Sequence, residues 1–156
     1  MKRIIISFAI AILAVFMGFT LYANLQHRFG WGVAGVTLDS PSNNLSVLSL
    51  SIFTYQDTYN RCPDSLRVLG PPAKGEATDW RAANLIEADL AMGKHSGYLY
   101  EYHRIGEGKW CEFTIHADPA ASKPEKLHYY TDQTAVKRYQ VGQRAGEGSP
   151  EYKKDN

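Results

Sequence analysis

The sequence has few of the residues and motifs that mark enzymes or metal proteins. It contains only two cysteines, with no CxxC pair and no spaced Cys/His set of the kind that binds zinc. GxSxG, HExxH and phosphate-loop motifs are also missing, and no serine lies in a recognisable nucleophile setting. We therefore predict a protein that is not an enzyme and needs no metal or cofactor. A hydrolase or a redox enzyme is the disfavoured alternative.

Concentrated charge is likewise absent. The chain carries 17 basic and 16 acidic residues, a net charge of +1, and no basic run suggests binding to nucleic acid. Residues 4–25 hold no charged side chain and follow Lys2 and Arg3. This apolar length is enough to cross a membrane as a helix, and the preceding charges favour a cytoplasmic N-terminus.

We predict a single-pass inner-membrane protein whose C-terminal domain lies in the periplasm or outside the cell. A cleaved signal peptide is the main alternative, although the run is long for one and Leu21 is large where a small residue is preferred. A buried globular helix is a third and weaker reading. The first two alternatives both export the domain.

Export bears on the two cysteines, Cys62 and Cys111. In an oxidising compartment such a pair favours a disulfide, while free thiols or a metal or redox site are the alternatives. A disulfide between them would close a loop of about 50 residues and stabilise the domain by roughly 4 kcal/mol.

The remaining chain divides by composition into a linker at 26–44, a folded domain at 45–141 and a flexible polar tail at 142–156. Leu45, Leu48, Ile52, Tyr55 and Tyr59 follow at spacings of three and four, which predicts a helix that ends before Pro63. A short turn over 63–70 and a second amphipathic helix from near Asp79 to Gly93 follow. Residues 94–97 read as a turn.

From Tyr98 the hydrophobic period changes to two. Strands are predicted at 98–105, 109–117, 126–131 and 135–141. A turn at Glu107 and Gly108 would pair Ile105 with Trp110 and His103 with Glu112. This register points Cys111 to the core, where it can meet Cys62. The predicted fold class is α+β, with an N-terminal transmembrane helix followed by amphipathic helices packed on a four-stranded antiparallel sheet.

Several segments from Leu45 onward resemble the type IV pilin-like proteins (pilins and pseudopilins) of bacteria, in an acidobacterial variant. They keep the family's order and approximate spacing, and they are FTYQDTYN (53–60), SLRVLG (65–70), ANLIEADLAMGKHSGYLYEY (83–102), HADP (116–119) and YYTDQTAVKR (129–138). The resemblance implies the pilin headgroup fold and a role in a pilus or type II secretion-like assembly.

The N-terminus departs from that family. Gly18-Phe19-Thr20-Leu21 matches part of a prepilin processing site, but it stands at the end of the apolar run. Cleavage after Gly18 would leave no membrane helix, so we interpret the tetrapeptide as chance.

Together these features predict a membrane-anchored exported protein that acts through protein–protein contacts in or beside a type IV pilus or type II secretion-like assembly. The alternative is a tethered or secreted binding module that does not assemble. The candidate interaction surface comprises His103, Glu112, His116 and Tyr98.

Overall fold

The computed structural model describes residues 40–106, 110–121 and 125–153. By its internal contacts the chain divides into two units, Met1–Val36 and Thr37–Asn156. The predicted membrane anchor, its Gly18–Leu21 tetrapeptide and most of the linker lie outside the described residues. Among the described residues, no helix combines the length and apolar character needed to cross a membrane.

The long helix α2 spans Pro41–Tyr59 and presents one apolar face to the core. Proline at its first position supplies a helical φ, and the helix ends at Asn60, which takes a left-handed conformation (φ 51°). The predicted inward face is confirmed, because four of its residues are at most 1% exposed: Leu45, Leu48, Ile52 and Tyr55.

The predicted second helix is wrong over most of its length. Only α3, Ala88–Ala91, is α-helical there, after the short 3-10 helix η1 at Leu66–Leu69. The Asp79 carboxylate accepts a hydrogen bond from the backbone N–H of Arg81 (2.7 Å), a local bond that competes with helix formation. The N–H groups of residues 83, 84 and 85 donate instead to the carbonyls of residues 68, 70 and 69. These bonds tie the connection to η1 and to Gly70, which follows it.

The sheet has five strands rather than the predicted four, and all neighbours are antiparallel in the order β1-β2-β3-β4-β5. The strands are β1 Lys94–His95, β2 Tyr98–Ile105, β3 Glu112–Pro119, β4 Leu127–Asp132 and β5 Arg138–Val141. The extra strand is β1, in the segment predicted as a turn. Ser96 and Gly97 both have positive φ (47° and 78°), which suits a two-residue hairpin loop that folds β1 onto β2.

The register predicted for the pair of strands that the structure shows as β2 and β3 is also wrong, by two residues. Ile105 lies opposite Glu112, and His103 lies opposite Thr114. The connection between β2 and β3 is longer than the predicted tight turn, because β2 ends at Ile105 and β3 begins only at Glu112. A shift of two preserves the alternation of side chains, so the predicted division into core and outer faces is unchanged.

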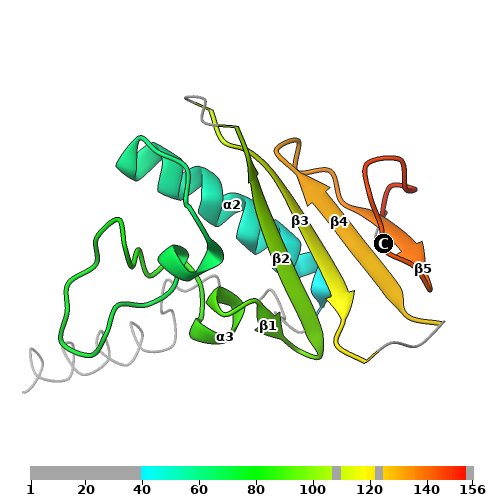
Figure 1. The fold of residues 1–156 in the computed structure, drawn as a ribbon, viewed down its shortest axis with the longest axis horizontal. Helices are drawn as coiled ribbons and strands as arrows, with labels where there is room; N and C mark the ends of the chain where they lie inside the picture. The colour runs from blue at the N-terminus through cyan, green and yellow to red at the C-terminus, as the bar shows by residue number, and fades with distance from the viewer. Residues whose placement is uncertain (1–39, 107–109, 122–124, 154–156) are drawn as a thin grey trace, which may run out of the picture. The chain divides into compact units, whose positions relative to one another are not determined.

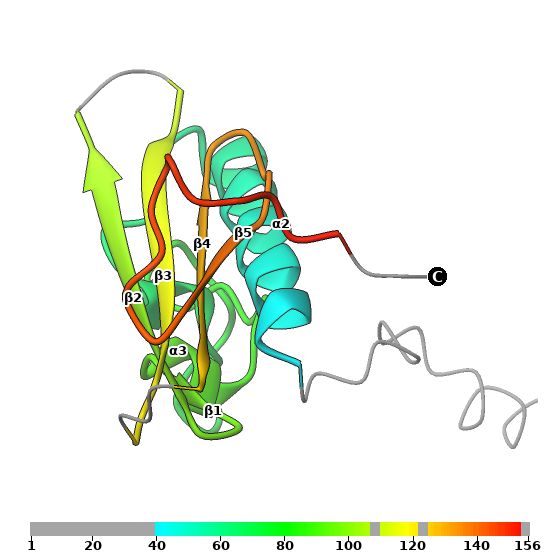
Figure 2. The same cartoon turned by 90° about the vertical axis from the view of Figure 1, so that its right-hand side faces the viewer.

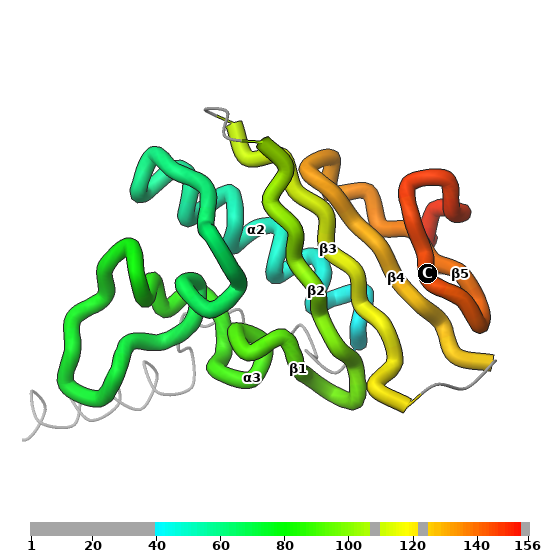
Figure 3. The backbone as a smooth tube through the Cα atoms, in the orientation of Figure 1, coloured from blue at the N-terminus to red at the C-terminus, as the bar shows by residue number. Residues whose placement is uncertain are grey.

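The helix and the sheet form two layers. Figure 1 shows α2 crossing behind the central strands, and Figure 2, turned by 90°, shows it on one side of the sheet. We call the side of the sheet that faces α2 the core face and the opposite side the outer face. The tube in Figure 3 shows the connection between η1 and α3 extending beyond the sheet. The core face supplies buried residues from three strands: Tyr100, Phe113, Ile115, Ala117 and Tyr129.

The segment that the sequence suggested as a flexible tail packs on the sheet over residues 142–153. Ala145 is 2% exposed, and the backbone N–H groups of Tyr139 and Tyr152 form hydrogen bonds with Pro150 and Lys137. The ring of Tyr152 packs edge-on against Tyr129 and Tyr139. In Figure 2 this segment starts on the outer face, opposite α2, before it returns.

One buried hydrogen bond joins the two layers. The Asn44 side-chain amide donates to the Tyr100 hydroxyl at 2.8 Å, and both residues are at most 6% exposed. Burial raises the pKa of Tyr100 to about 12, so the group that accepts the Asn44 hydrogen bond at neutral pH is the uncharged hydroxyl.

Replacing Tyr100 by Phe is therefore expected to destabilise the protein. The Asn44 amide would lose its buried acceptor, at a cost of about 1–3 kcal/mol in the free energy of unfolding. The double variant Asn44→Leu/Tyr100→Phe removes both polar groups and should recover most of that loss. Chemical denaturation of the double variant and of the two single variants measures these losses. A loss in the double variant equal to the sum of the losses in Asn44→Leu and Tyr100→Phe would contradict the argument.

Candidate interaction surfaces

The disulfide predicted from the two cysteines is confirmed. Cys62 follows the end of α2 and Cys111 precedes β3, with 5.3 Å between their Cα atoms. Both residues are buried, at 3% and 4% exposed. The bridge fixes the C-terminal end of the helix to the start of the central strand.

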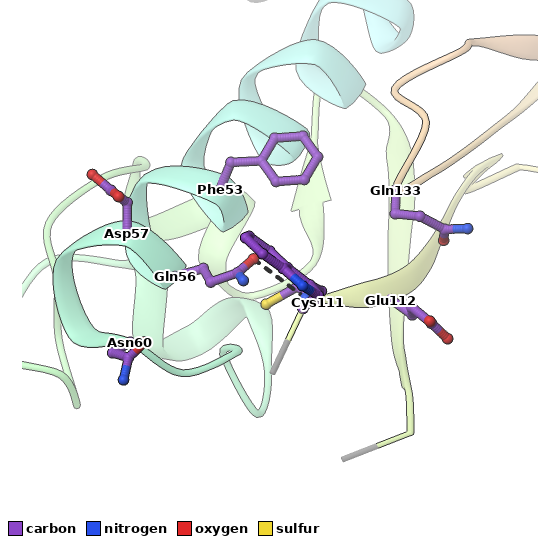
Figure 4. Close-up of a pocket in the computed structure, with 8 residues that line it drawn as sticks. Phe53, Gln56, Asp57, Asn60, Cys111, Glu112 and Gln133 are labelled. Carbon is purple, nitrogen blue, oxygen red and sulfur yellow. Dashed lines mark hydrogen bonds between the residues drawn. The ribbon is translucent and has the colours of Figure 1, made fainter. Parts of the chain in front are cut away.

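A groove lies beside this disulfide, with a volume of about 690 Å³. Figure 4 shows its residues arriving from α2 on one side and from β3 and the β4–β5 turn on the other. The lining combines aromatic, amide and carboxylate side chains: Phe53, Gln56, Asp57, Asn60, Trp110, Cys111, Glu112 and Gln133.

Two aromatic side chains of the groove are accessible to solvent. Trp110 is 73% exposed and Phe53 is 37% exposed. The Phe53 ring also packs on the buried Phe113, with 5.8 Å between the ring centroids. This contact holds the Phe53 ring in place. In Figure 4 the Phe53 ring points across the groove from α2.

Two glutamine side chains are oriented by the backbone that leads into β3. The Gln56 side-chain oxygen accepts a hydrogen bond from the Cys111 N–H (3.3 Å), and the Gln133 oxygen accepts one from the Phe113 N–H (3.4 Å). Because the amide oxygen of Gln133 takes this bond, its NH₂ group is the part left to donate to other groups.

The outer face of β2 is a second candidate surface. Leu99 and Ile105 stand on it, 42% and 46% exposed. One edge of β2 is covered by β1 at only two residues, Tyr98 and Leu99. The Tyr100 N–H donates to Gly93 (2.8 Å), so it points away from β3.

By the alternation of antiparallel strands, the backbone groups of Tyr102 and Arg104 also point to this edge. No described strand pairs with them there.

The four residues predicted as an interaction surface do not all meet. His103, Glu112 and His116 lie on the outer face, as the alternation predicts. Tyr98 lies on the core face, where its ring packs on Tyr129. Its hydroxyl donates to the carbonyl of Leu127 at 3.1 Å.

The expected pair of His103 with Glu112 is not formed. His103 contacts Glu101 on its own strand, with 2.8 Å between Nε2 and Oε1. Glu112 contributes instead to the groove. The two-residue shift in register accounts for both changes, because it places Thr114 rather than Glu112 opposite His103.

A chain of ion pairs covers part of the outer face. Arg144 of the C-terminal segment pairs with Glu101 on β2 and with Asp118 on β3 (3.4 Å), and Asp118 also contacts Nδ1 of His128 at 2.6 Å. The hydrogen bond from Arg144 is the main cause that lowers the pKa of Glu101. This network, formed with a segment predicted to be flexible, was not foreseen from the sequence.

His116 is the outer-face histidine that the C-terminal segment partly covers. Its Nδ1 atom has no hydrogen-bond partner among the described residues, and its ring packs edge-on against Tyr130. Burial and then the nearby charge of Arg144 lower its pKa from the ordinary value of 6.5.

Acidification is therefore expected to destabilise the fold through His116. The unfolded chain takes up this proton near pH 6.5, whereas the folded protein takes it up only at lower pH, so stability falls as pH drops through and below 6.5. Denaturation at about pH 7 and about pH 5 should show a smaller acid-induced loss for His116→Gln than for the natural protein.

His95→Gln, in the hairpin strand β1, is the control and should keep the full acid-induced loss. An unchanged loss in His116→Gln would contradict the assignment.

The described residues contain no group of three or more His, Cys, Asp or Glu side chains arranged to hold a metal ion. Compared with known proteins, the chain matches no family model, no curated protein and no solved structure. The relationship to pilin-like proteins therefore stays a prediction.

Proposed function

We propose that this chain is a membrane-anchored, exported protein related to the pilin-like proteins. Its folded unit acts through protein–protein contacts in or beside a type IV pilus or type II secretion-like assembly. Residues 4–25 hold it in the inner membrane, and the folded unit faces the periplasm or the outside of the cell. The Cys62–Cys111 disulfide supports export, because such bonds persist in oxidising compartments.

The observation that carries the contact role is the outer face of β2 with its open edge. Leu99 and Ile105 are large apolar side chains in contact with water, and the edge of β2 near Tyr102 and Arg104 has no described strand beside it. An exposed edge with apolar side chains is a surface on which another chain can add main-chain hydrogen bonds and bury hydrocarbon.

Photo-crosslinking in cells tests this contact. A photoreactive residue at Ile105 is expected to crosslink to other envelope proteins, among them a subunit of the assembly. The same residue at Glu76, exposed in the connection between η1 and α3, is the matched control. Equal crosslinking from both positions, or an unchanged pattern in cells that lack the pilus and secretion genes, would contradict the proposal.

The intact mass of the protein recovered from the envelope tests the anchor separately. A mass that corresponds to the full sequence is expected. A chain that starts at Phe19 would instead indicate prepilin-type processing, and one that starts near Asn24 would indicate a cleaved signal peptide.

A tethered binding module that does not assemble is the second candidate function. The groove beside the disulfide favours it, because two accessible aromatic rings and several polar residues line it.

A further inference from the structure

The groove beside the Cys62–Cys111 disulfide has a composition that restricts its ligand. Trp110 and Phe53 offer apolar rings that are open to solvent, and Trp110 is the most exposed of the large hydrophobic residues described. An exposed aromatic ring favours a ligand that also has a flat apolar surface. A groove of about 690 Å³ lies in the usual size range of small-ligand sites.

The polar side chains of the groove supply both kinds of hydrogen-bonding group. Asp57 and Glu112 can only accept when ionised, whereas the NH₂ groups of Gln133 and Asn60 donate. The Gln133 oxygen already accepts one hydrogen bond, from the Phe113 N–H, and both hydrogens of its NH₂ group can donate to a ligand. The ligand must therefore carry acceptors as well as donors.

This requirement separates three classes of ligand. A cationic peptide would suit the two carboxylates but would give the amide donors nothing to bind. An anion would suit the donors, but Asp57 and Glu112 would repel it, and no Lys or Arg is among the described residues that line the groove. A sugar presents hydroxyl groups that both donate and accept, on rings whose C–H faces are flat and apolar.

We propose that this groove binds a neutral oligosaccharide, with one sugar ring stacked on Trp110. Phe53 contacts the apolar face of the ligand from the α2 side. Gln133 and Asn60 donate to its hydroxyl or ring oxygens, and Asp57 and Glu112 accept from its hydroxyl groups. β-1,4-linked sugars with equatorial substituents present the flattest faces and are the best fit. This site is separate from the β2 contact surface and does not depend on the proposed assembly.

The disulfide would prepare the groove in advance of binding. It joins Cys62, which follows α2, to Cys111, which precedes β3. The bond therefore ties the helix that carries Phe53 to the chain next to Trp110. A groove with fixed walls loses little conformational freedom when the ligand arrives.

Binding can be measured on the full-length protein in a detergent without a sugar headgroup. The probes are cellotetraose and tetra-N-acetylchitotetraose, followed by tryptophan fluorescence and calorimetry. We expect at least one of them to bind, and Trp110→Ala to weaken that binding by about tenfold or more. Trp80→Ala is the matched control, because Trp80 is also exposed (44%) but does not line the groove.

A second variant protects the test against loss of folding. Gln133→Glu keeps the size of the side chain but replaces its donors by acceptors, and it should also weaken binding while the thermal unfolding temperature stays close to that of the natural protein. The proposal would be overturned if neither saccharide binds, or if Trp80→Ala weakens binding as much as Trp110→Ala. Binding of a lysine-rich peptide in place of both saccharides would also overturn it. The Ile105 crosslinking tests the β2 contact surface and these measurements test the groove, so either proposal can fail without the other.

Discussion

Removing the Cys62–Cys111 disulfide is expected to lower the free energy of unfolding by roughly 4 kcal/mol, the chain-entropy value for a loop of about 50 residues. For a folded unit of this size, that loss corresponds to a fall of roughly 15 °C in the unfolding temperature. The bond joins residues 49 apart in sequence, so the unfolded chain gains much freedom when it is absent. The double variant Cys62→Ala/Cys111→Ala avoids placing a serine hydroxyl in the buried site.

The measurement is thermal unfolding by circular dichroism with and without a reducing agent. The natural protein should lose stability when reduced, whereas the double variant should be equally unstable in both conditions. If the natural protein unfolds at the same temperature with and without reductant while mass analysis shows the thiols to be free, the bridge does not stabilise the fold.

Replacing Leu48 by Ala is the second change with a large expected effect. Leu48 is fully buried in the inward face of α2, against the core face of the sheet. The truncation removes buried hydrocarbon and leaves a cavity, which costs about 2–5 kcal/mol in the free energy of unfolding. Urea denaturation of the variant beside the natural protein measures this loss.

Leu50→Ala is a closely matched control. It makes the same chemical change two residues along the same helix, but Leu50 is 63% exposed. Its effect on the free energy of unfolding should lie within about 0.5 kcal/mol, because little buried surface is lost. Equal effects of the two substitutions would mean that α2 does not pack on the sheet by the face described here.

Local patterns in the sequence were sufficient for several elements. The spacing of Leu45, Leu48 and Ile52 identified the long helix, since only one face of a helix with this spacing can be buried at once. The alternation in residues 98–105 and 109–117 identified two strands, observed at Tyr98–Ile105 and Glu112–Pro119, and their core faces. The Cys62–Cys111 bridge followed from the pairing of two cysteines in a predicted exported domain.

The predicted elements were wrong where backbone N–H groups form hydrogen bonds with distant carbonyl groups instead of local ones. The segment after Asp79 has helical spacing, yet its N–H groups bond to η1, and only Ala88–Ala91 forms an α-helix. The strand β1 is two residues long and depends on positive φ at Ser96 and Gly97, which no hydrophobic period can signal.

The candidate sites were less predictable than the fold. His103 and His116 were placed on the correct face, but the partner of His103 depended on a register that a two-residue shift changes without affecting burial. The groove unites Phe53, Trp110 and Gln133, which are far apart in the chain. An exposed aromatic residue next to a cysteine was the only local signal for it.

The sequence by itself therefore determined the long helix, two of the strands, their inward faces and the pairing of the cysteines, because each depends on side-chain periodicity or on the small number of possible partners. Only the tertiary structure decided the strand register, the fifth strand, the packing of residues 142–153 and the groove beside the disulfide. These features depend on hydrogen bonds and contacts between segments distant in sequence, whose energies become available only once the helix and the sheet have come together.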